Sequence, residues 1–143
     1  MNVQIPSPRH YESMYGTSDV VRNYLNQIEG QIAQAFSQEA FDILRISLLI
    51  AHPDELAQGK FLEYEKFDWR GGFAAVGVNG NFERYHFGTD LEKILALSEM
   101  LQAAFTRISK RKKAKLDYRL ASEIIVQTTQ SFKEELTKNQ VIL

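Results

Sequence analysis

The side chains best suited to catalysis or metal binding lie far apart in this sequence. The three histidines, His10, His52 and His86, lack the short regular spacing of a local metal site. They would have to converge with carboxylates in the folded chain to bind a metal, so we expect ordinary surface or partly buried histidines. Cysteine is absent, which excludes thiol catalysis, disulfides and cysteine-based zinc sites. The sequence therefore predicts no metal site.

Two further polar pairs are candidates for acid–base chemistry. Glu63 and Glu65 would share one face of a strand, and we favour a solvated sheet face, or a cross-strand partner for Arg84, over catalysis as their explanation. Arg84 and His86 would also share a face, as a phosphate-binding site requires, but no nucleophile pattern or phosphate-binding loop accompanies them. We expect no catalytic residues and no cofactor, and the sequence favours a non-enzymatic protein.

Positive charge is concentrated in one short stretch. Six of the 17 basic residues lie together: Arg107, Lys110, Arg111, Lys112, Lys113 and Lys115. The remaining chain has eleven basic against 18 acidic residues, although the net charge is only −1. Such a run suits the C-terminal end of a helix, or a docking patch for an acidic protein or nucleic acid.

Aromatic residues form the second concentration. Eight of the 16 lie between positions 61 and 88. Because aromatic and arginine side chains dominate the energetics of protein interfaces, the exposed members of this stretch are candidate anchors, and the basic run would steer the partner. The partner-binding residues expected from these patterns are Trp69, Arg84, Tyr85, Lys110, Arg111, Lys112 and Lys113.

The N-terminal part of the chain is predicted to be an extended arm followed by two helices. Prolines at positions 6 and 8 favour the arm, over residues 1–16. Apolar residues recur every four positions from Ser18 to Phe36 behind good N-cap residues, which predicts a helix. Residues 38–51 are nearly all apolar and also alternate as in a strand, but their length and a helix-start signal at residues 37–39 favour a helix.

An antiparallel meander is expected next. Its three strands would be residues 60–70, 73–78 and 81–87, with turns at Gly71-Gly72 and Asn79-Gly80. Asn-Gly is the strongest hairpin signal in the sequence, because a type I′ turn needs positive φ at both central positions.

Two helices complete the predicted fold. Thr89 and Glu92 have the spacing of a capping box and predict a helix over residues 90–109. A second apolar stripe predicts a helix from about Leu116 to Asn139. The expected fold is α+β, a single domain over residues 17–143 with the helices packed on one face of the sheet.

These features favour an intracellular protein-binding domain. A small, cysteine-free chain without catalytic motifs is typical of a bacterial immunity protein or antitoxin that neutralises a toxin by direct binding, and such a protein would be cytoplasmic. No signal pattern or apolar run of about 20 residues indicates a membrane. Two alternatives stay open: nucleic-acid binding through residues 107–115 and exposed aromatics, or a small-molecule enzyme or sensor with a pocket between sheet and helices. The oligomeric state is not predicted.

Overall fold

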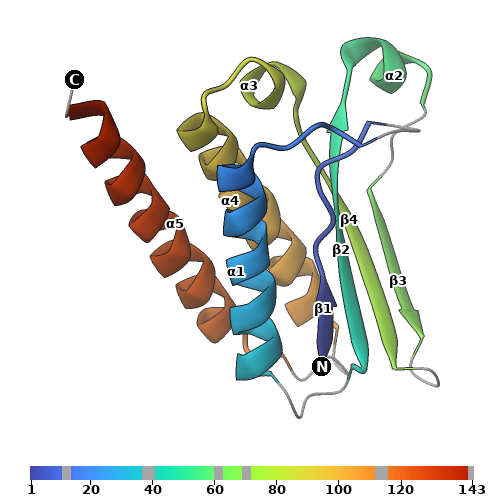
Figure 1. Cartoon of the computed structure of the whole chain (residues 1–143). Coiled ribbons are helices and arrows are strands. Elements are labelled where there is room, and N and C mark those ends of the chain that lie inside the picture. Colours follow the sequence, from blue (N-terminus) through green and yellow to red (C-terminus); the bar gives the residue numbers. More distant parts are fainter. Residues whose placement is uncertain (11–13, 37–40, 60–62, 69–71, 112–115, 142–143) are drawn as a thin grey trace.

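A four-stranded mixed sheet forms one side of the molecule (Figure 1). The structure is a computed structural model that describes residues 1–10, 14–36, 41–59, 63–68, 72–111 and 116–141. In spatial order, the strands are β1 (Asn2–Gln4), β2 (Ile43–Ala51), β4 (Phe73–Asn81) and β3 (Tyr64–Asp68). β1, β2 and β4 are parallel, and β3 pairs antiparallel with β4.

The long helices lie on one face of this sheet. α1 (Asp19–Ala35) and α4 (Asp90–Ser109) pack on the strands, and α5 (Tyr118–Val141) packs on both helices on the side away from the sheet (Figure 1). The short helices α2 (Pro53–Ala57) and α3 (Phe82–His86) follow β2 and β4 at the upper end. Within the described ranges, no helix combines the length and apolarity needed to cross a membrane.

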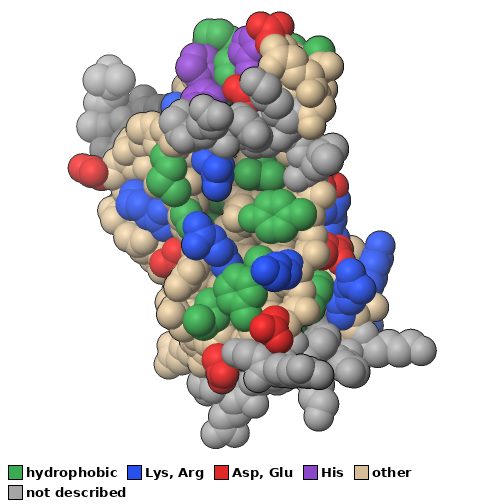
Figure 2. All heavy atoms as spheres, turned by 90° about the vertical axis from the view of Figure 1, so that its right-hand side faces the viewer, with side chains coloured by type: hydrophobic (Ala, Val, Ile, Leu, Met, Phe, Trp, Pro, Cys, Tyr) green, Lys and Arg blue, Asp and Glu red, His purple; other side chains and the backbone are tan. Residues whose placement is uncertain are grey.

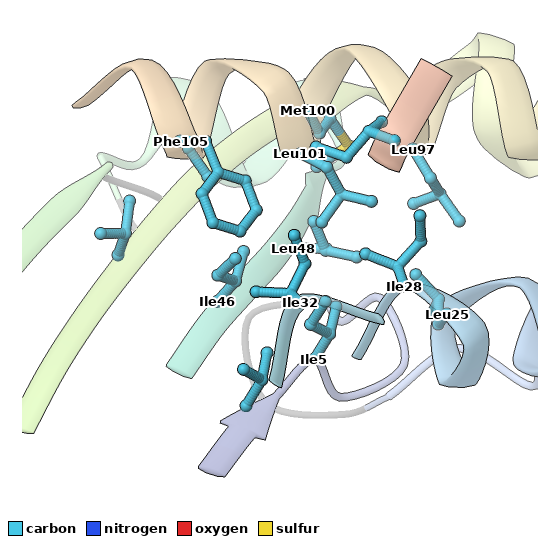
Figure 3. Packing of buried hydrophobic residues seen from close by; sticks show 14 of the residues in the cluster. Ile5, Leu25, Ile28, Ile32, Ile46, Leu48, Leu97, Met100, Leu101 and Phe105 are labelled. Atoms are coloured by element: carbon cyan, nitrogen blue, oxygen red, sulfur yellow. The ribbon is translucent and has the colours of Figure 1, made fainter. Parts of the chain in front are cut away.

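The core fills the space between the sheet and the first helix layer. Figure 3 shows side chains of β2 pointing toward α4 and α1, with the arm contributing Ile5 from the side. Ile5, Ile28, Ile46 and Phe105 are fully buried. Burying a large apolar side chain stabilises a fold by roughly 1.5–3 kcal/mol, so the arm belongs to the folded domain from its first residues onward.

The predicted α1, α4 and α5 helices are confirmed. Ser18 is the N-cap of α1, and its side chain accepts a hydrogen bond from the Val21 amide. Both hydrogen bonds of the capping box between Thr89 and Glu92 are present at the start of α4. These helices were predictable because their caps and their four-residue apolar stripes agree.

The predicted helix over residues 38–51 is wrong, because residues 43–51 form strand β2. β2 is a central strand, paired with β1 on one side and β4 on the other. From Ile46 to Ala51 the strand is buried on both faces, and such a stretch reads as a continuous apolar run, which periodicity does not distinguish from a buried helix. Residues 37–40 lie outside the described part of the chain.

The meander is only half correct. β3 and β4 form the expected antiparallel pair, and Gly72 has the positive φ of a turn glycine. The predicted Asn79-Gly80 hairpin and the strand over residues 81–87 are wrong. Asn79 and Gly80 lie inside β4, where they continue the parallel ladder with β2, and α3 begins directly afterwards. Asn81 starts this helix as its N-cap by accepting a hydrogen bond from the Arg84 amide.

Candidate functional site

All three histidines converge at the upper end of the molecule, where the parallel strands β2 and β4 end. His52 follows β2 directly and caps α2, and His86 ends α3, which follows β4. His10 lies in the arm beside Arg9, whose amide donates to the Leu48 carbonyl of β2 at 3.0 Å. Figure 2 shows the histidine side chains gathered at this end. The carboxyl ends of parallel strands are the usual place for a binding site in an open sheet.

The histidines are joined by aromatic rings into one continuous row. His10 stacks on Tyr15 with ring centroids 3.7 Å apart, and Tyr15 lies 5.9 Å from His86. His86 stacks on Phe82 at 4.9 Å, and Phe82 meets His52 edge-on at 4.7 Å. No group of three or more histidine or carboxylate ligands among the described residues has metal-site geometry. The row forms a continuous packed aromatic surface at this end.

Large apolar side chains are exposed around this row. Phe87 is 76% exposed and touches His86 edge-on at 4.8 Å. Leu56 of α2 and Met14 of the arm are each 53% exposed. We call this end, residues 10, 14, 15, 52–56 and 82–87, the histidine tip. Three of the six large hydrophobic side chains exposed in the described part of the chain lie in it. Clustered exposed apolar groups mark interaction sites more often than single ones do.

The short helices give the histidine tip a negative rim. α2 carries Asp54 and Glu55, and α3 carries Glu83. The Asp54 side chain is 82% exposed and lies 3.5 Å from the His52 ring. The single arginine of α3, Arg84, has its guanidinium 2.5 Å from the Glu99 carboxylate of α4, which neutralises it.

Tyr15 connects the arm to this rim. Its hydroxyl is buried and has no hydrogen-bonding partner among the described residues. Burial, and secondarily the negative charge of Glu55, raise the pKa of Tyr15 to about 12. The phenol therefore stays neutral at physiological pH and serves to pack the tip rather than to carry charge.

The structure distributes the predicted partner-binding residues over separate places. Tyr85 is only 2% exposed and packs in the core, so its prediction as a surface anchor is wrong. The predicted strand over residues 81–87 puts Tyr85 on a sheet face, whereas Tyr85 lies on the buried side of helix α3. Arg84 is half-exposed but paired with Glu99. Trp69, Lys112 and Lys113 lie outside the described residues.

The described members of the basic run lie at the opposite end of α4 from the histidine tip. Lys110 is exposed at the C-terminal cap of the helix. Arg111 donates two hydrogen bonds to Glu65 of β3 and lies over the Phe67 ring at 5.1 Å. Arg107 pairs with Glu63. The two arginines thus fasten β3 to α4, and 20 helical residues, about 30 Å, separate the basic end from the negative tip.

Two grooves of the described structure are small. A groove of about 180 Å³ lies between the end of β4 and α4, and another of about 210 Å³ lies between α1 and α5. Ligand pockets usually enclose about 300–1,000 Å³. These grooves lend little support to a small-molecule site between sheet and helices.

No protein-family model, curated protein or solved structure matches this chain.

Proposed function

We propose that this protein is a protein-binding domain that docks a basic partner protein through the histidine tip. The observation that carries the proposal is the exposure of Phe87 and Leu56 beside the carboxylates of α2 and α3. An apolar centre with a polar rim is the usual composition of a protein interface.

The chemistry of the tip selects cationic groups on the partner. Asp54 and Glu83 supply negative charge, and the Arg84 cation is already neutralised by Glu99. An arginine or lysine of the partner can also stack on the exposed ring of Phe87, which is worth about 0.5–1 kcal/mol at an exposed site.

The distribution of charge along α4 favours the same orientation. Lys110 lies beyond one end of the helix, in the stretch that holds six of the 17 basic residues of the sequence, and the acidic tip lies at the other end. A molecule polarised in this way approaches a basic partner with its negative end first, and salt weakens the effect.

The narrower form of the proposal is a bacterial immunity protein or antitoxin that neutralises its toxin by direct binding. Its support is compositional: the chain has no cysteine and a catalytically bare sequence. A toxin that acts on nucleic acid needs a basic substrate surface, which the acidic tip would cover. In this form the protein blocks its partner and has no reaction of its own.

The alternative of nucleic-acid binding by residues 107–115 is weakened by the ion pairs in that segment. Arg107 and Arg111 are taken by Glu63 and Glu65, which lowers the positive charge available to phosphates. We therefore give this run a structural role at its two arginines.

The test begins with affinity capture from native lysate, followed by binding measurements on the purified partner. Phe87→Ala and the charge reversal Asp54→Lys/Glu83→Lys should each weaken binding by about tenfold or more, because both remove contacts at the centre or rim of the tip. Leu120→Ala is the matched control, since Leu120 is an exposed apolar residue on α5. A partner that binds both tip variants as tightly as the unaltered protein contradicts the proposed surface, and the absence of any captured partner contradicts the function.

A further inference from the structure

The helices leave the other face of the sheet uncovered, and its side chains are arranged in rows across the strands. Figure 2 shows hydrophobic and cationic side chains next to one another on this face. The strand register places Arg45 of β2, Ala75 of β4 and Lys66 of β3 in one row. The next row contains Ser47, Gly77 and Tyr64.

Tyr64 crosses this face above Gly77. Its hydroxyl donates a hydrogen bond to the Ser47 hydroxyl, two strands away, at 2.6 Å. A Cβ atom added to Gly77 would collide with the Tyr64 ring, so the ring lies directly on the glycine backbone. Tyr64 is nevertheless 40% exposed. One ring face is therefore held on the sheet while the other is open to solvent.

Two cations flank this ring. Arg45 and Lys66 are both exposed, and neither makes an ion pair with another described residue. Ala75 between them is small, so their side chains meet no bulky neighbour in the row. On a strand, residues two apart are about 7 Å apart, which places Lys66 one row from Tyr64.

The acidic residues of β3 change this charge little. Glu65 faces the helix side of the sheet and pairs with Arg111, and Glu63, just before the strand, pairs with Arg107. Asp68 is the acidic residue of β3 on the open face, two residues beyond Lys66 in the row of Phe73. The centre of the face is thus cationic and aromatic, and its negative charge lies at one edge.

We propose that this face binds single-stranded nucleic acid, and we call Arg45, Tyr64, Lys66 and Phe73 the Tyr64 platform. One base stacks on the open ring face of Tyr64, and Arg45 and Lys66 contact the neighbouring phosphates. Half-buried Phe73, two rows away, offers a second apolar contact. Stacking on fixed rings beside a cationic track is the usual mode of single-strand binding. The platform is independent of both the histidine tip and the basic run.

Fluorescence anisotropy with labelled mixed-sequence RNA and DNA oligonucleotides of about 12 nucleotides tests the proposal. Tyr64→Ala should weaken binding by about 5- to 100-fold through the loss of one stacked base. Arg45→Gln/Lys66→Gln, which alters only exposed side chains, should weaken binding and flatten the dependence of log affinity on log salt by about 0.7 for each lost phosphate contact.

The control variants separate this site from the others. Phe87→Ala should leave oligonucleotide binding unchanged, and so should Lys110→Gln. Thermal unfolding by circular dichroism shows whether each variant is folded. The proposal is overturned if the unaltered protein gives a flat titration at about 50 mM salt. It is also overturned if Lys110→Gln lowers the affinity for the oligonucleotide and Tyr64→Ala does not. The proposal is also overturned if the Arg45→Gln/Lys66→Gln variant loses binding to a protein partner but still binds the oligonucleotide as tightly as the unaltered protein does.

Discussion

Replacing Gly77 by alanine tests how Tyr64 lies on the sheet. The added methyl group meets the Tyr64 ring before any other described atom, and the backbone at Gly77 has no positive φ that alanine would resist. The ring must therefore move away from β4. The perturbation acts on one contact and leaves the strand able to form.

The expected loss combines two contributions. Moving the ring breaks the 2.6 Å hydrogen bond to Ser47, worth about 1 kcal/mol. It also exposes part of a large aromatic side chain, worth roughly 1–2 kcal/mol. Alanine in place of glycine also stabilises the protein by about 0.5–1 kcal/mol, because it lowers the conformational entropy of the unfolded chain. Gly77→Ala should thus lower the free energy of unfolding by about 1–2 kcal/mol.

A double-mutant cycle isolates the contact. In a Tyr64→Ala background the methyl group meets no ring, so Gly77→Ala should raise the free energy of unfolding by about 0.5–1 kcal/mol. The coupling between the two positions is then about 2 kcal/mol, measured by urea denaturation followed by circular dichroism. If Gly77→Ala has the same effect in both backgrounds within about 0.5 kcal/mol, Tyr64 does not cover Gly77 and the Tyr64 platform does not exist as described.

Further predictions concern tyrosines, a cap and the core. Tyr15→Phe removes a buried hydroxyl that has no hydrogen-bonding partner among the described residues, so it should be neutral or stabilising by up to about 1 kcal/mol. Tyr24→Phe breaks the 2.8 Å hydrogen bond to Thr129 and should destabilise the protein by about 1 kcal/mol in the same denaturation assay. The pKa of Tyr15 is about 10 in the unfolded chain and about 12 in the folded one, so the folded state keeps the phenol proton to higher pH. The free energy of unfolding should therefore fall between pH 10 and 12, by at most about 1.4 kcal/mol per pH unit from this group. Comparing the pH dependence of Tyr15→Phe with that of the unaltered protein checks this, and identical curves would refute it. Thr89→Ala should cost about 1 kcal/mol by opening the capping box of α4, and Thr89→Ser should restore most of it. Ile46→Ala should cost about 2–5 kcal/mol, because this side chain is fully buried.

The helices were predictable from local signals alone. Ser18, Thr89 and Glu92 act within a few residues of their own positions, and α1, α4 and α5 each carry an apolar stripe along one side. A local pattern of this kind predicts a helix independently of how the rest of the chain folds.

The sheet was less predictable because its pairing is not local. The dipeptide Asn79-Gly80 suits a tight hairpin, but the parallel ladder from Leu49 to Ala51 holds these residues in extended conformation. Tertiary pairing overrides a turn preference when a partner strand is available on the correct side. Asn81, one residue later, uses its side chain as a helix cap instead.

The histidine tip has no continuous signature in the sequence. His10, His52 and His86 come from the arm, from the end of β2 and from the end of α3, and they meet because parallel strands finish at the same edge of the sheet. His52-Pro53 directly after an apolar run was the available signal. If that run is assigned as a strand, His52 lies at its carboxyl end, where binding sites of open sheets usually lie.

The prediction of a helix over residues 38–51 made both the histidine tip and the Tyr64 platform unpredictable. If residues 43–51 are a helix, Arg45 and Ser47 belong to a helix surface and His52 only ends it. If they are a strand, the alternation that buries Leu44 and Ile46 places Arg45 and Ser47 on the opposite face, where Tyr64 reaches Ser47. The same strand ends at Ala51 and delivers His52 to the tip. The period-two pattern of this segment therefore predicts the position of Arg45 in the Tyr64 platform and the position of one histidine together. The Gly77 double-mutant cycle tests the contact between Tyr64 and β4 on which the platform depends.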